Sequence, residues 1–124
     1  MARRPPDLHL AAVIFLGGML GTLARAGLDQ ALPSGGPAWP WATLLANVAG
    51  AALLGWSTIA LTGHRVRRQL VGTGFCGGLT TFSALQLELY RLLDDGRVGL
   101  ALLYAAASIA LGLAAAVGGR RLAR

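Results

Sequence analysis

Apolar residues fall into four long runs along the chain, and short polar or charged segments separate these runs. Each run reaches the roughly 20 residues that an α-helix needs to cross the hydrocarbon core of a bilayer. The pattern therefore predicts an all-α membrane protein with four transmembrane helices. The expected spans are about 8–31, 39–62, 69–93 and 98–119.

The segments between the runs have the composition of turns. A Pro- and Gly-containing segment, 33–37, ends the first run, a basic loop at 63–68 ends the second, and 94–96 reads Asp-Asp-Gly. The first run follows Met-Ala-Arg-Arg, as a signal peptide would, but it is too long and contains Gly17, Gly18 and Gly21. We interpret it as a retained span and expect residues 1–124 to form one transmembrane domain.

Composition supports this interpretation. Of the 124 residues, 55% are hydrophobic, and the mean hydropathy is +0.60. A small soluble domain buries only a limited share of its surface. Lipid is therefore the expected surrounding of the excess apolar surface.

The charges are distributed unevenly between the two sides of the predicted membrane. All 11 basic residues are arginines, and the net charge is +6. Three arginines lie on one side, diluted by three aspartates. Eight lie on the side of both termini: Arg3, Arg4, Arg65, Arg67, Arg68, Arg120, Arg121 and Arg124. The positive-inside rule then predicts a multi-pass protein of the cell membrane with cytoplasmic termini. The arginines form no stripe, so no nucleic-acid partner is expected.

Several kinds of chemistry have no support in the sequence. A single cysteine, Cys76, excludes an internal disulfide. No nucleophile, base or metal-ligand cluster is evident, so the chain is not expected to be an enzyme. Glu88 and Asp29 are placed near span ends, and no acidic residue is placed at mid-depth. This argues against a small multidrug-type carrier, which would need a titratable group in its path.

The third run contains an unusual stretch, Gly72-Thr-Gly-Phe-Cys-Gly-Gly-Leu-Thr-Thr-Phe-Ser83, with four glycines and three threonines. Unpaired backbone at membrane depth is tolerated only when it is buried in protein or lines a cavity. The stretch either stays helical and packs closely or breaks for a purpose. A broken helix offers carbonyls to a cation and N–H groups to an anion.

Other polar side chains at membrane depth are few. Asn47 follows Thr43 by one turn in the second span, and Ser108 follows Tyr104 by one turn in the fourth. Such residues serve either as interhelical hydrogen bonds or in function. Amide and hydroxyl groups, with the positive edge of the Phe82 ring, would suit a small hydrated anion.

Three motifs resemble the Fluc (CrcB) family of fluoride channels, and the similarity spans nearly the whole chain. They are Gly17-Gly-Met-Leu-Gly-Thr-Leu-Ala-Arg25, Thr43-Leu-Leu-Ala-Asn-Val-Ala-Gly50 and Gly74-Phe-Cys-Gly-Gly-Leu-Thr-Thr-Phe-Ser83. The third motif is the most specific.

The resemblance implies a passive channel that exports fluoride and so reduces its toxicity. It implies that two four-helix subunits pack as an antiparallel, dual-topology dimer in the lipid bilayer. A structural sodium ion, which is not transported, would lie at the dimer centre on the carbonyls of Gly77 and Thr80 at the break of the third helix. Arg25 would lie near the vestibule. The implied pore-lining residues are Asn47, Thr81, Phe82, Ser83, Leu85, Tyr104 and Ser108.

The sequence departs from the family pattern at two positions. Ala84 stands where a threonine is expected, and Leu85 stands where a second pore phenylalanine is expected. A homodimer would therefore lack one anion station in each path. Together with the arginine bias, this leads to the hypothesis of a heterodimer with an oppositely oriented paralogue. A non-conducting subunit of such a channel remains an alternative, because a pore half that loses polar lining groups loses function.

Overall fold

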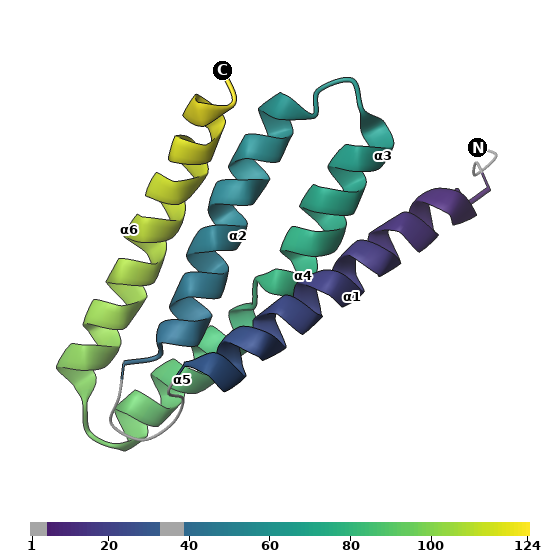
Figure 1. The fold of residues 1–124 in the computed structure, drawn as a ribbon. Helices are drawn as coiled ribbons and strands as arrows, with labels where there is room; N and C mark the ends of the chain where they lie inside the picture. The colour runs from purple at the N-terminus through teal and green to yellow at the C-terminus, as the bar shows by residue number, and fades with distance from the viewer. Residues whose placement is uncertain (1–4, 33–38) are drawn as a thin grey trace.

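The structure is a computed structural model, and it describes residues 5–32 and 39–124. Every regular element in these residues is helical, and the chain crosses the molecule four times (Figure 1). The expected all-α fold with four helical segments is confirmed. The elements are α1 (Leu8–Ala31), α2 (Trp41–Ala60), α3 (Arg65–Arg68), η1 (Gln69–Cys76), α4 (Gly77–Leu79), α5 (Phe82–Asp94) and α6 (Val98–Leu122).

Among the described residues, three helices are long and apolar enough to cross a membrane: α1, α2 and α6. The first begins where Asp7 accepts a hydrogen bond from the Leu10 amide at 3.1 Å, which satisfies one of the free N–H groups of the first turn. The last continues through Arg120 and Arg121, whose charges are favourable at a helix C-terminus. The expected break at 33–37 lies outside the described residues.

The third crossing is not one regular helix. It begins at Arg65, earlier than the expected start at 69, and passes into a π-helix of eight residues, η1. The short helix α4 follows, and then Thr80 and Thr81 adopt extended backbone angles before α5 begins. The interruption near the middle agrees with the composition of the stretch. The π-helix was not predicted.

Glycines allow α1 to cross η1 and α4 in direct backbone contact. A Cβ at Gly17 would collide with the Leu70 carbonyl, and one at Gly21 would collide with the Phe75 carbonyl. Small residues at such intervals are how membrane helices approach each other closely. On the other side, α2 and α6 lie side by side, with Gly119 against the Ala52 carbonyl (Figure 1).

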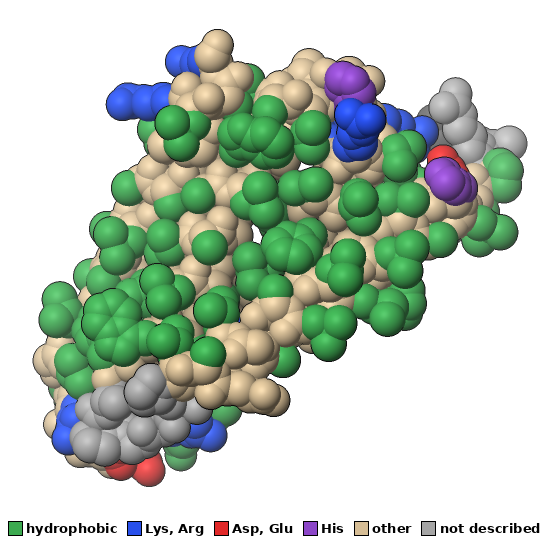
Figure 2. Space-filling view, viewed as in Figure 1, with side chains coloured by type: hydrophobic (Ala, Val, Ile, Leu, Met, Phe, Trp, Pro, Cys, Tyr) green, Lys and Arg blue, Asp and Glu red, His purple; other side chains and the backbone are tan. Residues whose placement is uncertain are grey.

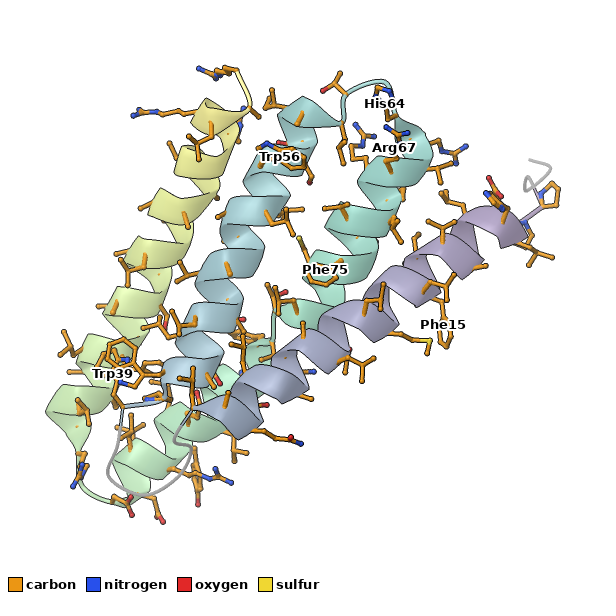
Figure 3. The ribbon with its side chains drawn as sticks, viewed as in Figure 1. Phe15, Trp39, Trp56, His64, Arg67 and Phe75 are labelled. Carbon is orange, nitrogen blue, oxygen red and sulfur yellow. The ribbon has the colours of Figure 1, made fainter. Side chains whose placement is uncertain are left out.

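Few large side chains are buried within the chain. Leu44, Leu92, Ala101 and Tyr104 form a small cluster between α2, α5 and α6. Hydrophobic side chains cover the visible sides of the molecule, and most of the visible charged side chains lie near its ends (Figure 2). Phe15, for example, is 67% exposed and points away from the bundle (Figure 3). Such a surface suits lipid or a further protein subunit, and not water.

Candidate functional site

Helix α2 directs one face toward the interrupted third crossing. Thr43, Asn47 and Gly50 follow one another at intervals of four and three residues, so they share this face. Each of them contacts a different point of the third crossing. Thr43 bonds to Glu88 in α5, Asn47 bonds to Thr81 at the interruption, and Gly50 makes room for Thr80. This face of α2 therefore positions the interruption.

The side chain of Asn47 pairs with the backbone of Thr81 through two hydrogen bonds. Its Oδ1 accepts from the Thr81 N–H at 2.8 Å, and its Nδ2 donates to the Thr81 carbonyl at 3.1 Å. An amide carries both a donor and an acceptor, so it can replace the partners that a regular helix would supply. The interruption is thus stabilised by a side chain from another helix.

Thr80 is held between α4 and α2. Its N–H and its hydroxyl both donate to the Cys76 carbonyl, at 2.9 and 2.8 Å. Its methyl group lies against Gly50, where an added Cβ would collide with it. The absence of a side chain at Gly50 therefore lets the interruption pack directly on α2.

Backbone carbonyls at the interruption lose their usual helical donors, and those of Gly77 and Thr80 are among them. In a continuous α-helix, Gly77 O would accept from the Thr81 N–H and Thr80 O from the Ala84 N–H. The first N–H donates instead to Asn47, and the second to the Thr81 hydroxyl, at 3.2 Å. Gly77 is also exposed, and a Cβ there would meet nothing within 4 Å. These are the two positions at which the sequence predicts a sodium site, and free carbonyl oxygens fit a hard cation.

The carbonyl neighbouring this pair has a cationic partner. Arg25, on α1, donates from Nε to the Gly78 carbonyl at 3.3 Å. The expected vestibule residue thus touches the last turn before the interruption. Within residues 5–32 and 39–124, no group of three or more His, Cys, Asp or Glu side chains could hold a metal ion.

A second polar group lies next to the interruption and centres on Glu88. Its Oε1 accepts from the Thr43 hydroxyl at 2.7 Å, and its Oε2 accepts from the Tyr104 hydroxyl at 2.6 Å. Ser108 follows Tyr104 by one turn of α6. The rings of Tyr104 and Trp39 form a T-shaped pair, with centroids 5.4 Å apart and an angle of 89° between the ring planes.

The sequence analysis missed Glu88, because it placed this residue near the end of the third span, 69–93. In the structure α5 begins only at Phe82, so Glu88 lies in its second turn and is half-buried. A carboxylate that follows an expected helix break by so few residues is a signal that could have found it.

Phe82 and Ser83 are the first two residues of α5, and both are exposed. The Phe82 ring is 70% exposed, and the Ser83 hydroxyl lies 3.2 Å from that of Thr81. Leu85 lies on another side of the helix, where it packs against the cluster around Tyr104. The structure thus brings Asn47, Thr81, Phe82 and Ser83 together, and it places Leu85 with Tyr104.

Comparison with known proteins decides the family. The sequence pattern described as "CrcB-like protein, Camphor Resistance (CrcB)" matches residues 12–120. The chain belongs to the CrcB family. Relatives in this family include proteins named "Fluoride-specific ion channel FluC 1" from Mycolicibacterium paratuberculosis and "Fluoride-specific ion channel FluC" from Thermus thermophilus. The first is 49% identical over 114 residues, covering 88% of this chain and 86% of the relative. The second is 44% identical over 116 residues, covering 89% and 91%.

Membership of the CrcB family agrees with the resemblance found in the three motifs, all of which lie within residues 12–120. It makes the chain a multi-pass membrane protein of an ion-channel family and not an enzyme. The roles of individual residues in a pore stay predictions.

Proposed function

We propose that this chain forms a fluoride-specific channel that lets cytoplasmic fluoride leave the cell passively. The observation that carries the proposal is the 49% identity to a protein named as a fluoride-specific ion channel, over 88% of this chain. The site supplies what such a path needs: amide and hydroxyl groups at an interrupted helix and an exposed aromatic ring beside them.

A second subunit completes the channel in this proposal. Thr80 and Thr81 have extended backbone angles and are only partly buried, and irregular backbone is not tolerated against lipid. An open hollow formed by α1 and α4 offers a surface on which a second subunit would pack. It is lined by Phe15, Gly18, Met19, Thr22, Leu23 and Gly78. An antiparallel partner would cover these groups, and fluoride would pass along the interface by Asn47, Thr81, Phe82, Ser83, Tyr104 and Ser108.

A structural sodium ion at the dimer centre is part of the proposal. Gly77 and Thr80 would each contribute a carbonyl, and two subunits would together supply four oxygens. When bound, the ion supplies positive potential to an anion path whose proposed lining residues carry no positive charge. The diversion of two N–H donors, to Asn47 and to Thr81, supports this assignment.

The partner is proposed to be an oppositely oriented paralogue. The eight arginines on the side of the termini favour one orientation with both termini in the cytoplasm. Leu85 has no aromatic ring, and it packs near Tyr104 instead of lying beside the exposed Phe82. A complementary or non-conducting half of a heterodimer is therefore the second candidate. The carrier alternative gains nothing from Glu88, because both of its carboxylate oxygens accept hydrogen bonds from hydroxyl groups.

Growth on fluoride tests the proposal in cells. The chain is expressed in a bacterium without its own fluoride exporter, alone and together with a paralogue from the same genome. We expect growth at fluoride concentrations that stop the parent strain, in one or both conditions. If the chain reaches the membrane and neither condition restores growth, the proposal is wrong.

A further inference from the structure

The N–H of Thr81 donates to a side-chain oxygen instead of the backbone oxygen that a continuous helix would provide. In a continuous helix it would donate to the Gly77 carbonyl four residues earlier. In the structure it donates to Asn47 Oδ1 at 2.8 Å, and Thr81 has the extended angles φ −148° and ψ 124°. The acceptor comes from α2, 34 residues away in sequence. The Gly77 carbonyl therefore loses its donor because of a side chain on a different helix.

The second bond of Asn47 makes this arrangement specific. Its Nδ2 donates to the carbonyl of the same residue, Thr81, at 3.1 Å. The two bonds close a ring between one side-chain amide and one backbone residue, so neither group can rotate without breaking a bond. The next donor in the sequence is diverted in a similar way, since the Ala84 N–H donates to the Thr81 hydroxyl at 3.2 Å.

We propose that Asn47 is the positioning residue of a sodium site: by holding the Thr81 N–H, its side-chain oxygen keeps the Gly77 carbonyl available to the ion. This inference rests on the sodium ion of the proposed function. It assigns Asn47 an effect on cation binding that is separate from any contact with fluoride. In the absence of this acceptor, the Thr81 N–H returns to Gly77 O, and the site loses one ligand from each subunit.

Substitutions can distinguish the role of the Asn47 side-chain oxygen from that of its nitrogen. Asn47→Leu has similar volume and removes both the acceptor and the donor. Asn47→Asp keeps an acceptor for the Thr81 N–H but cannot donate to the Thr81 carbonyl when ionised. Thr43→Val is the matched control, because Thr43 lies one turn away on the same face of α2 and bonds to Glu88, not to the interruption.

The measurement is the thermal stability of the purified full chain, with its partner where one is needed, as sodium replaces N-methyl-D-glucamine. A ligand that binds only the folded state raises the melting temperature, and above its Kd the increase grows with the logarithm of the ligand concentration. We expect sodium to stabilise the wild type, Asn47→Asp and Thr43→Val. We expect Asn47→Leu to need roughly tenfold or more sodium for the same shift, the effect of losing one interaction with a charged partner.

The outcomes separate the inference from the proposed function. If Asn47→Leu responds to sodium as the wild type does, the inference is wrong, but the proposed channel function is unaffected. Loss of the response in Asn47→Asp also overturns it, because the acceptor is still present. No response in the wild type removes the sodium site itself, and with it this inference. If Asn47→Leu does not fold, Asn47→Ala replaces it and is read in the same way.

Discussion

The hydroxyl of Tyr104 donates to Glu88 Oε2 at 2.6 Å and so ties α6 to α5. The other carboxylate oxygen accepts from Thr43 of α2 at 2.7 Å. Side chains from α2 and α6 thus both bond to one carboxylate, which lies in the second turn of α5. Because α5 is separated from α4 by extended residues, it has no continuous backbone hydrogen bonding to hold its direction. The Glu88 contacts supply that restraint from outside the helix.

Tyr104→Phe should weaken this restraint. Tyr104 is fully buried, and its removal leaves one oxygen of Glu88 without its donor. Losing a hydrogen bond to a charged group costs about 1.5–3 kcal/mol of folding free energy. We expect a lower melting temperature and reduced fluoride flux. Tyr90→Phe is the control, since Tyr90 is on the same helix as Glu88 and is 64% exposed. Equal stability of the two variants would contradict the assigned role of the contact.

Gly50→Ala should displace the interruption, because the new methyl group would collide with the methyl group of Thr80. Overpacking of this kind costs about 1–3 kcal/mol. We expect lower stability and loss of flux, measured on the purified protein and in liposomes. Gly112→Ala, where a Cβ meets nothing within 4 Å, should behave as wild type.

The same collision can be relieved from the other side. Thr80→Ser removes the methyl group and keeps the hydroxyl that donates to the Cys76 carbonyl. The double variant Gly50→Ala/Thr80→Ser should therefore recover much of the stability that Gly50→Ala loses. Additive losses in the double variant would show that the two residues are not in contact.

Gly21→Ala should separate α1 from the third crossing. A Cβ at Gly21 would meet the Phe75 carbonyl and would lie 2.8 Å from the Leu79 amide nitrogen. Backbone atoms cannot move aside as a flexible side chain can, so we expect a large fall in the amount of folded protein, measured by size-exclusion chromatography. Gly27→Ala, further along α1, meets nothing within 4 Å and should fold normally.

The arginine distribution predicts a single orientation in the membrane. A C-terminal tag should be accessible only from the cytoplasmic side of intact cells. Replacing Arg65, Arg67 and Arg68 by glutamine should reduce the bias and produce molecules in both orientations. If the wild-type chain already inserts in both orientations equally, the hypothesis of a fixed orientation is wrong, and a homodimer becomes the simpler assembly.

Some of this architecture could be read from the sequence. Apolar runs of sufficient length predicted the three long helices, and the first expected span has the same bounds as α1, 8–31. The concentration of glycine and threonine between Gly72 and Ser83, residues that weaken helices, marked the stretch as one that either packs closely or breaks, and the family resemblance implied the break. Both signals are local, so they depend little on how the helices pack.

Features that depend on packing between distant segments were not predictable in the same way. The π-helix at Gln69–Cys76 lies where backbone contacts with α1 replace side-chain contacts, and no local pattern records such a register. The pairing of Asn47 with Thr81 joins residues on two helices, and sequence offered only a choice between packing and function for Asn47. Glu88 lies in the second turn of α5 because the helix begins anew after the extended residues Thr80 and Thr81.

The most direct test of the central claim is anion efflux from liposomes that contain the purified chain, alone or with its paralogue, in sodium buffer. Valinomycin and potassium carry the balancing charge, and electrodes follow fluoride and chloride in parallel samples. The account predicts rapid fluoride efflux, little chloride efflux, and loss of fluoride efflux with Asn47→Asp. Efflux from the chain alone would show a complete channel, and efflux only with the paralogue would show an obligate heterodimer. No fluoride efflux in either sample, or equal efflux of both anions, would contradict the account.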